Sequence, residues 1–330
     1  MTHTVIITDT HFGIKNNSQK WLSKQLEGLN EVLEYIHEYK YSHPDDDVLL
    51  VHCGDVFDSR SSINTMVLKE ARNMLYELAD SVKEFIIIGG NHDYYSPNEE
   101  YLEVNTLDLL LQHPNITLIT KVYDMRGIND FMYMFVPYYS FDGDKYNLPD
   151  LLKQYDPKVV FTHADLYNTF FDGKIVISGH IHTPVSYGNS HNICSTFATT
   201  FADANSERGF YTLDCEQFCY DLKLHPLKNI IRFHTLFDNT DGFFDNRHVN
   251  TYDYMRIYVT TEHRQDPRYM KVVEKYQEMC DNVDVIIYNA DSNINESFSD
   301  VIDMDSIISS MIPDYLQEKF ENIKCTTLKN

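Results

Sequence analysis

The sequence predicts an α/β fold in which two mixed β-sheets form a sandwich flanked by helices, with a small β-α-β domain appended. In the first half, short apolar runs alternate with longer amphipathic stretches, as strands and helices do. After Val185 the pattern changes to strands alone, and a polar segment at 239–250 precedes a compact strand, helix and strand. We therefore expect a first domain at 1–228, a second at 229–295 and a C-terminal tail at 296–330.

Short apolar runs give the expected strands, and the amphipathic segments between them give the helices. Strands are expected at 4–8, 48–53, 85–88, within 116–137, and at 159–162, 175–178, 210–213 and 218–224. Helices are expected at 19–39, 63–79 and 101–112. The small domain would hold strands at 254–260 and 283–288 around a helix at 267–280, and the tail a helix at 304–320.

Composition narrows the class of protein. A chain of 330 residues with 43% hydrophobic residues can bury a sizeable core. No apolar run approaches the roughly 18 residues of a membrane span, so we expect no membrane association. Six cysteines without a CxxC pair fit reduced thiols and a cytoplasmic protein. The formal charge of −23 means that any binding to nucleic acid needs bound cations, local basic clusters or a basic partner.

Five polar motifs each follow an expected strand. In open α/β sheets, ligands gather beyond the carboxyl ends of the strands. The motifs are Asp9-Thr10-His11, Gly54-Asp55-Val56-Phe57-Asp58, Gly90-Asn91-His92-Asp93, His163, and Gly179-His180-Ile181-His182. Alone, each would more often be a helix cap, a turn or a hydrogen-bonded side chain. Their occurrence together, in order, indicates one site.

The donor types in these motifs indicate a pair of metal ions. Aspartate oxygen, asparagine carbonyl and imidazole without thiolate suit Mn²⁺, Fe²⁺ or Zn²⁺. Seven such side chains are too many for one ion, but they are enough for two ions that share one bridging carboxylate. Such a pair activates water and neutralises the charge that grows on a phosphoryl group, so hydrolysis of a phosphate ester is the expected reaction.

The motif set resembles the calcineurin-like metallophosphoesterase superfamily, and within it the SbcD-type nuclease subunits, including those of tailed phages. The resemblance implies a four-layer metallophosphoesterase sandwich with a small β-α-β capping domain. It also implies the roles of the motif residues. One metal would be held by Asp9, His11 and His182, the other by Asn91, His163 and His180, and Asp55 would bridge them. His92 would act on the scissile phosphate, and Asp93 would orient His92 or a ligand.

One position departs from the SbcD-type pattern. Many of those nucleases have a second histidine where this chain has Asp58. Asp58 would either pair with His92 and raise its pKa or cap the helix expected near Ser61 or Ser62.

Three neighbouring residues are candidates for substrate contacts. Arg60 would contact phosphate or form a surface ion pair. Tyr94 and Tyr95 would stack on unpaired bases or pack beside the site.

The resemblance implies a Mn²⁺-dependent DNA exonuclease and endonuclease subunit. It would act as a homodimer with an SbcC-type, SMC-like ATPase, in DNA recombination, repair or replication, in the cytoplasm of a bacterial or phage-infected cell. The tail helix at 304–320 is the candidate docking element for the ATPase, and the two early helices are the candidate dimer contact. A phosphomonoesterase, or another small-molecule or phosphoprotein phosphoesterase, is the alternative. A scaffold without metals is disfavoured because the histidines are intact.

Overall fold

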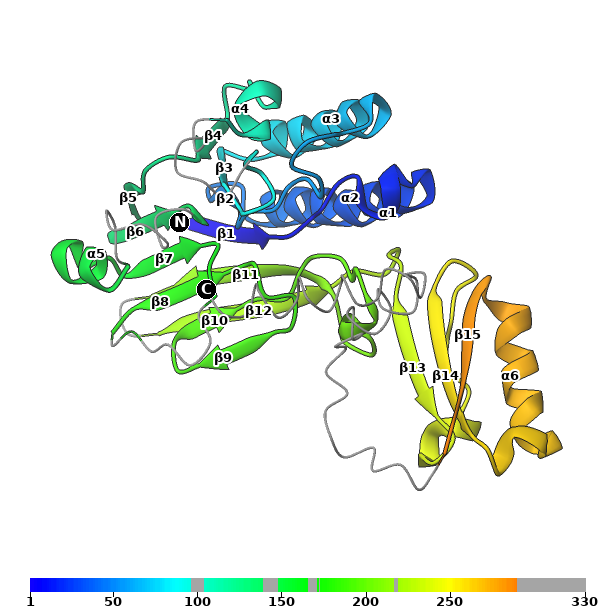
Figure 1. Ribbon diagram of the computed structural model, residues 1–330. Coiled ribbons are helices and arrows are strands. Elements are labelled where there is room, and N and C mark those ends of the chain that lie inside the picture. The colour runs from blue at the N-terminus through cyan, green and yellow to red at the C-terminus, as the bar shows by residue number, and fades with distance from the viewer. Residues whose placement is uncertain (96–103, 139–147, 166–170, 172, 217–218, 290–330) are drawn as a thin grey trace, which may run out of the picture.

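The computed structural model describes residues 1–95, 104–138, 148–165, 171, 173–216 and 219–289. These residues form two six-stranded mixed sheets and one three-stranded sheet. The predicted α/β class, with two mixed sheets flanked by helices, is confirmed (Figure 1). The helix predicted at 304–320 lies outside the described residues. Within the described part of the chain, no helix has both the length and the apolar character needed to cross a membrane.

The first sheet has the order β12-β11-β1-β2-β3-β4, with parallel pairing from β1 to β4 and antiparallel pairing of β11 and β12 at one edge. Its strands are β1 (Thr2–Ile7), β2 (Asp47–His52), β3 (Glu84–Ile88), β4 (Ile116–Ile119), β11 (Gly209–Cys215) and β12 (Tyr220–Pro226). The helices of this half are α1 (Ile14–Asn17), α2 (Gln19–Ser42), α3 (Thr65–Ser81) and α4 (Thr106–Leu110).

The second sheet has the order β5-β6-β7-β8-β10-β9, with parallel pairing from β6 to β10 and antiparallel edges. Its strands are β5 (Asp124–Ile128), β6 (Phe131–Val136), β7 (Val159–Thr162), β8 (Ile175–Ser178), β9 (Val185–Tyr187) and β10 (Ser190–Asn192). Helix α5 (Leu148–Tyr155) precedes β7.

Alternating side chains along the central strands divide the core into layers, because successive residues of a strand point to opposite faces. In β1, Val5 and Ile7 pack in the cluster that contains α2 and α3, whereas Ile6 packs in the cluster between the two sheets. In β7, Phe161 belongs to the cluster between the sheets, and Val160 packs on the far side with leucines of α5. The first half is therefore a helix, sheet, sheet, helix sandwich.

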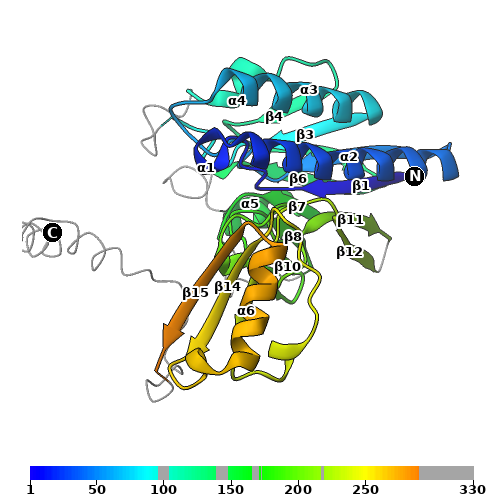
Figure 2. The ribbon, with the colours of Figure 1, turned by 90° about the vertical axis from the view of Figure 1, so that its right-hand side faces the viewer.

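The small sheet contains one strand more than predicted. Strands β13 (Phe233–Phe237), β14 (Tyr254–Thr260) and β15 (Asn282–Tyr288) pair in parallel, and α6 (Pro267–Met279) covers one face (Figure 2). Strand β13 was not predicted because its apolar residues do not alternate: Phe233 and Leu236 pack in different clusters. The domain boundaries at 228 and 295 and the capping role stay predictions.

Trp21 of α2 joins the first sandwich to the small sheet. Its ring is buried, with centroids 6.0 Å from Phe233 and 5.9 Å from Tyr254, and its Nε1 donates to the Tyr254 hydroxyl at 3.4 Å. It is the only tryptophan of the chain. Because α2 begins a few residues after the first motif, this contact fixes the small sheet relative to the predicted site.

Trp21→Ala should lower the free energy of unfolding by about 3–5 kcal/mol, because it removes a large buried ring and leaves a cavity between two elements. Trp21→Phe should lose clearly less, since most of the ring volume is kept. Urea unfolding followed by circular dichroism measures both. Equal stability of Trp21→Ala and the wild type would show that the two parts do not depend on this contact.

Candidate metal centre

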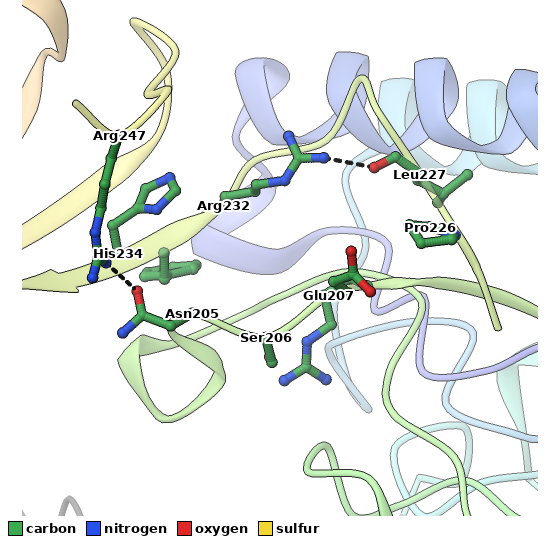
Figure 3. A pocket seen from close by; sticks show the side chains of 10 residues that line it. Asn205, Ser206, Glu207, Pro226, Leu227, Arg232, His234 and Arg247 are labelled. Carbon is green, nitrogen blue, oxygen red and sulfur yellow. Dashed lines mark hydrogen bonds between the residues drawn. The ribbon is translucent and has the colours of Figure 1, made fainter. Parts of the chain in front are cut away.

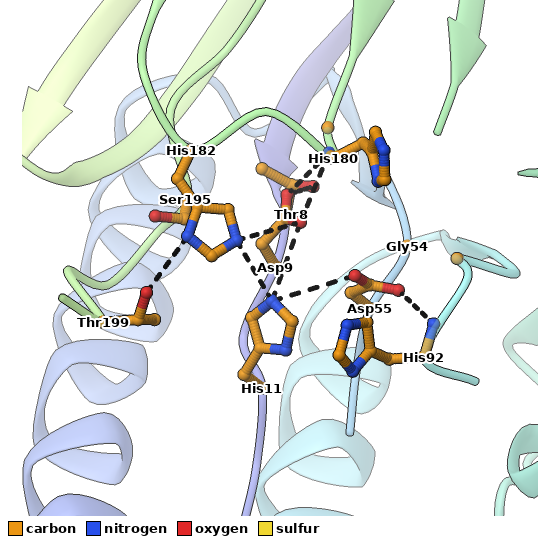
Figure 4. Close-up of polar contacts among 12 residues, drawn as sticks. Thr8, Asp9, His11, Gly54, Asp55, His92, His180, His182, Ser195 and Thr199 are labelled. Carbon is orange, nitrogen blue, oxygen red and sulfur yellow. Dashed lines mark hydrogen bonds and ion pairs between the residues drawn. The ribbon is translucent and has the colours of Figure 1, made fainter. Parts of the chain in front are cut away.

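All five motifs lie at the carboxyl ends of parallel strands, where the two sheets meet. Asp9 follows β1, Asp55 follows β2, Asn91 follows β3, His163 follows β7 and His180 follows β8. Figure 4 shows side chains of the first, second, third and fifth motifs converging. The strand register places these ends side by side, since β1, β2 and β3 pair in parallel in one sheet and β7 and β8 in the other.

The first group consists of Asp9, His11 and His182. The Nε2 atoms of the two histidines lie 3.3 Å apart, and both are 3.8–3.9 Å from Oδ1 of Asp9. One ligand atom from each residue lies within 4.8 Å of the other two. The predicted first metal set is therefore brought together in space.

The second group consists of Asn91, His163 and His180. The side-chain oxygen of Asn91 lies 3.0 Å from Nε2 of His163 and 3.0 Å from Nδ1 of His180. One ligand atom each of Asp55, His163 and His180 also lie within 4.8 Å of one another. The three residues predicted to hold the second metal thus face a common point.

Asp55 lies between the two groups. Its Oδ2 is 3.8 Å from Nε2 of His11 in the first group and 3.4 Å from Nε2 of His163 in the second. Its Oδ1 accepts the backbone N–H of His92 at 2.8 Å. One carboxylate oxygen therefore faces both groups, as the predicted bridging role requires.

The contacts of His163 indicate positive charge between its ring and the side chain of Asn91. Nδ1 of His163 donates to the carbonyl of Cys53 at 2.6 Å, because a carbonyl can only accept. In the neutral ring, Nε2 then carries a lone pair directed at the oxygen of Asn91, which is itself an acceptor. Two acceptors this close repel, so this contact needs positive charge at Nε2, which either a proton or a bound metal ion supplies. The donor set therefore fits a divalent metal ion.

The pKa shifts of His163 and Asp55 also indicate positive charge at this centre. Burial by itself would lower the pKa of His163, but the carboxylate of Asp55 and its hydrogen bond outweigh burial and raise the pKa to about 9. Burial would also raise the pKa of Asp55, yet His163 and then His11 and His92 hold it well below its usual range. The centre therefore stabilises positive charge beside an ionised Asp55.

The backbone at the ligands is unusual. Asp9, His11, Asp55 and His180 all have positive φ, between 45° and 78°, where residues other than glycine are uncommon. Each such residue costs of order 1–3 kcal/mol, and such residues cluster at functional sites. Gly90 is required for a different reason: a Cβ there would lie 2.2 Å from the backbone nitrogen of Asp55.

Comparison with known proteins places these motifs in a family. The family model of calcineurin-like phosphoesterases matches residues 2–184, which include all five motifs and more than half of the chain. The chain belongs to the calcineurin-like phosphoesterase family. The predicted family resemblance is therefore confirmed, and the chain is a metal-dependent hydrolase.

Among curated proteins, this family member is similar to exonuclease subunit 1 of Enterobacteria phage T4, with 26% identity over 226 residues. The match covers 63% of this chain and 63% of the phage protein, so it spans less than two thirds of that relative.

Two solved structures match less closely. A protein of unknown function from Aquifex aeolicus is 17% identical, with 56% of this chain and 81% of that chain covered and a TM-score of 0.29. A 5'-nucleotidase from Candida albicans SC5314 is 14% identical, with 56% and 43% covered and a TM-score of 0.30. Scores this low carry no argument about this phosphoesterase.

Asp93 of this phosphoesterase holds the backbone of the second and third motifs. Its fully buried carboxylate accepts N–H bonds from Asp55 and Gly90 at 3.0 Å and from Val56 at 3.1 Å. The ring of His92 is hydrogen-bonded to the Asp58 carbonyl, whereas Asp93 holds the backbone of Asp55, the residue predicted to bridge the two metals. Burial and the nearby Asp55 raise the pKa of Asp93 to about 7, although the N–H donors favour its ionised form.

His92 is oriented by the main chain of Asp58. Its Nδ1 donates to the Asp58 carbonyl at 2.7 Å, which leaves Nε2 for other partners in a cavity of about 420 Å³. The Asp58 carboxylate lies 3.6 Å from Nδ1 of His11, and burial raises its pKa. Of its two predicted roles, capping the helix is wrong, because α3 begins at Thr65 and Asn64 accepts from the Met66 N–H, whereas pairing with His92 stays a prediction.

Of the three residues predicted to contact substrate, one is buried in the core and two are accessible to solvent. Tyr94 is fully buried and its hydroxyl donates to the Thr120 carbonyl at 2.5 Å, so the prediction that it stacks on bases is wrong. Tyr95 is 55% exposed and Arg60 is half-buried, and both stay candidates.

Residues that the motifs did not reveal also line the cavity, among them Lys15, Thr199 and Thr200. Lys15 has a left-handed conformation, with φ 52° and ψ 48°, next to the first motif. Three consecutive residues, 15–17, have positive φ, which asparagine adopts more readily than other non-glycine residues, but Lys15 itself gives no local signal for that conformation. Only its position four residues after His11 in the sequence could have suggested that Lys15 lies at the cavity.

Asp93→Asn should lower the affinity for Mn²⁺ by about 10–100-fold, because one of its carboxylate oxygens becomes an NH₂ group that cannot accept from the backbone amides around Asp55. Isothermal titration with Mn²⁺ in the absence of substrate measures this.

Asp253→Asn is the matched control, since the buried Asp253 also accepts two backbone N–H bonds, but in the small sheet's region. It should lower stability and leave metal affinity within about threefold. Unchanged affinity in Asp93→Asn would contradict the role of Asp93.

Proposed function

We propose that this phosphoesterase is a Mn²⁺-dependent DNA nuclease subunit with exonuclease and endonuclease activity. The observation that carries the proposal is the position of Asp55, with one oxygen facing both ligand groups and the other accepting the His92 N–H. The similarity to exonuclease subunit 1 of phage T4 supports DNA as the substrate class. A phosphodiester is the group on which such a centre and an adjacent imidazole would act together.

Manganese is the proposed metal because the donors are carboxylate, amide oxygen and imidazole. Among the described residues, the ligand groups contain no cysteine, and Cys53 takes part only through its main-chain carbonyl. Asp9, His11 and His182 would hold one ion, Asn91, His163 and His180 the other, and Asp55 both. When bound, the two ions would lower the pKa of a water molecule and neutralise charge on the phosphate.

His92 would act on the leaving side of the phosphodiester. Its Nδ1–H is fixed to a carbonyl, so only Nε2 can exchange a proton with the leaving oxygen or donate to a phosphate oxygen. The ring of His11 packs edge-on against it, with centroids 5.0 Å apart. Lys15, at the edge of the same cavity, would neutralise a neighbouring phosphate.

The charge of the chain favours a partner for DNA binding. With a formal charge of −23, the subunit alone should bind DNA weakly, because nonspecific affinity comes from cationic side chains. We therefore propose that an SbcC-type ATPase is the partner and that it docks on the tail. We also propose a homodimer formed through α2 and α3. The complex would act in the cytoplasm of a bacterial or phage-infected cell. DNA recombination, repair or replication is the proposed setting.

The wild-type protein with Mn²⁺ should degrade linear DNA and barely hydrolyse p-nitrophenyl phosphate. His92→Ala should reduce the rate of DNA hydrolysis by about 10²–10⁴-fold, as expected on removing a proton donor. His43→Ala, which changes an exposed histidine stacked on Tyr39, is the control and should retain activity.

Asp58→Asn tests whether Asp58 acts through its carbonyl. This variant keeps the backbone acceptor for His92 and should retain activity within about tenfold.

Fast hydrolysis of p-nitrophenyl phosphate by the wild-type protein, with DNA left intact, would select the phosphomonoesterase instead.

A further inference from the structure

The ring of His182 is held by a hydroxyl and a carboxylate behind it. Nδ1 of His182 lies 3.0 Å from Oγ1 of Thr199, and that hydroxyl lies 3.2 Å from Oδ2 of Asp203 (Figure 4 shows the first contact). An ionised carboxylate only accepts, so the single hydrogen of Thr199 points at Asp203. The hydroxyl must then accept from His182. Nδ1 of His182 therefore carries the proton, and Nε2 presents its lone pair towards His11.

Asp203 is itself fixed by Arg208. Nη2 of Arg208 donates to Oδ1 of Asp203 at 2.9 Å, and each side chain is only 1% exposed. Nη1 of Arg208 also donates to the main-chain carbonyl of His182 and to Oγ of Ser195 at 3.1 Å. The same ion pair thus holds both the backbone and, through Thr199, the ring of His182. His182, Thr199, Asp203 and Arg208 are thus linked in a ring of hydrogen bonds.

The chain between Thr199 and Arg208 is anchored at both ends. The carboxylate of Asp203 accepts the backbone N–H groups of Thr199 at 2.7 Å and Thr200 at 3.0 Å. Asn205 donates its N–H to the carbonyl of Phe233 and accepts from Arg247 at 2.9 Å, at the start of the small sheet (Figure 3). The hydroxyl that faces His182 therefore sits on a segment with little freedom to move.

We propose that Thr199, Asp203 and Arg208 are positioning residues that set the tautomer and the place of His182 as a metal ligand. The proposal rests on the proposed metal-binding function of His182. A buried ion pair is costly, and Nε of Arg208 has no hydrogen-bond partner among the described residues, yet the bonds that this pair does make hold His182. Groups that hold a ligating histidine by its second nitrogen raise metal affinity, and their loss lowers it by about 10–100-fold.

Thr199→Val tests the proposal most cleanly, because valine keeps the shape and removes only the hydroxyl. In Mn²⁺ titrations without substrate, one of two sites should weaken by about 10–100-fold, while the other changes by less than about threefold. Thr199→Ser should restore affinity to within about threefold of the wild type. Thr212→Val is the matched control, since Thr212 is a buried threonine whose hydroxyl lies 3.0 Å from Nε2 of His225, and it should bind Mn²⁺ as the wild type does.

Asp203→Asn provides a second variant, because it keeps the size of the side chain while changing the acceptor of the Thr199 hydroxyl. It should weaken the same site. His182→Ala is the reference and should lose that site altogether. Wild-type affinity at both sites in folded Thr199→Val, or in His182→Ala, would overturn the proposal. Intact Mn²⁺ binding without DNA hydrolysis in the wild type would defeat the nuclease proposal alone, because the titrations contain no substrate.

Discussion

Burying ionised carboxylates is unfavourable unless positive charge compensates them, and that constraint governs the centre of this molecule. Asp9 is fully buried and Asp55 nearly so, with lone pairs of Asn91 and His163 directed at the same space. Burial raises the pKa of Asp9, whereas nearby histidines lower that of Asp55. Cations between the two groups would satisfy both carboxylates, which is why the fold can keep so many acceptors together.

The two sheets make that arrangement possible. Each brings parallel strands to the same edge, and the turns that follow are tight enough to require left-handed residues and glycine at close approaches. Asp93 fixes two of these turns through backbone amides, and the Asp203–Arg208 pair fixes the chain around His182. The strain at the proposed ligands is therefore balanced by buried polar groups that lie outside the proposed ligand set.

Local pattern predicted much of the fold. Strands β7, β8 and β14 have the predicted bounds, because their apolar runs are short, continuous and ended by polar motifs. The residues proposed as ligands could be found since each lies within four residues of the end of a strand. Tertiary contacts left no such signal. The contact of Arg208 with His182 joins residues far apart in the sequence. The burial of Tyr94 could not be predicted from its position beside the third motif. Strand β13 was missed because its apolar residues face two different clusters.

Anomalous diffraction at the manganese absorption edge, from crystals soaked in MnCl₂, would show directly whether two ions share Asp55. We expect two anomalous peaks about 3.5–4 Å apart, one on either side of the Asp55 carboxylate. One should lie among Asp9, His11 and His182, and the other among Asn91, His163 and His180. A single peak, or two peaks that do not share Asp55, would contradict the proposed centre.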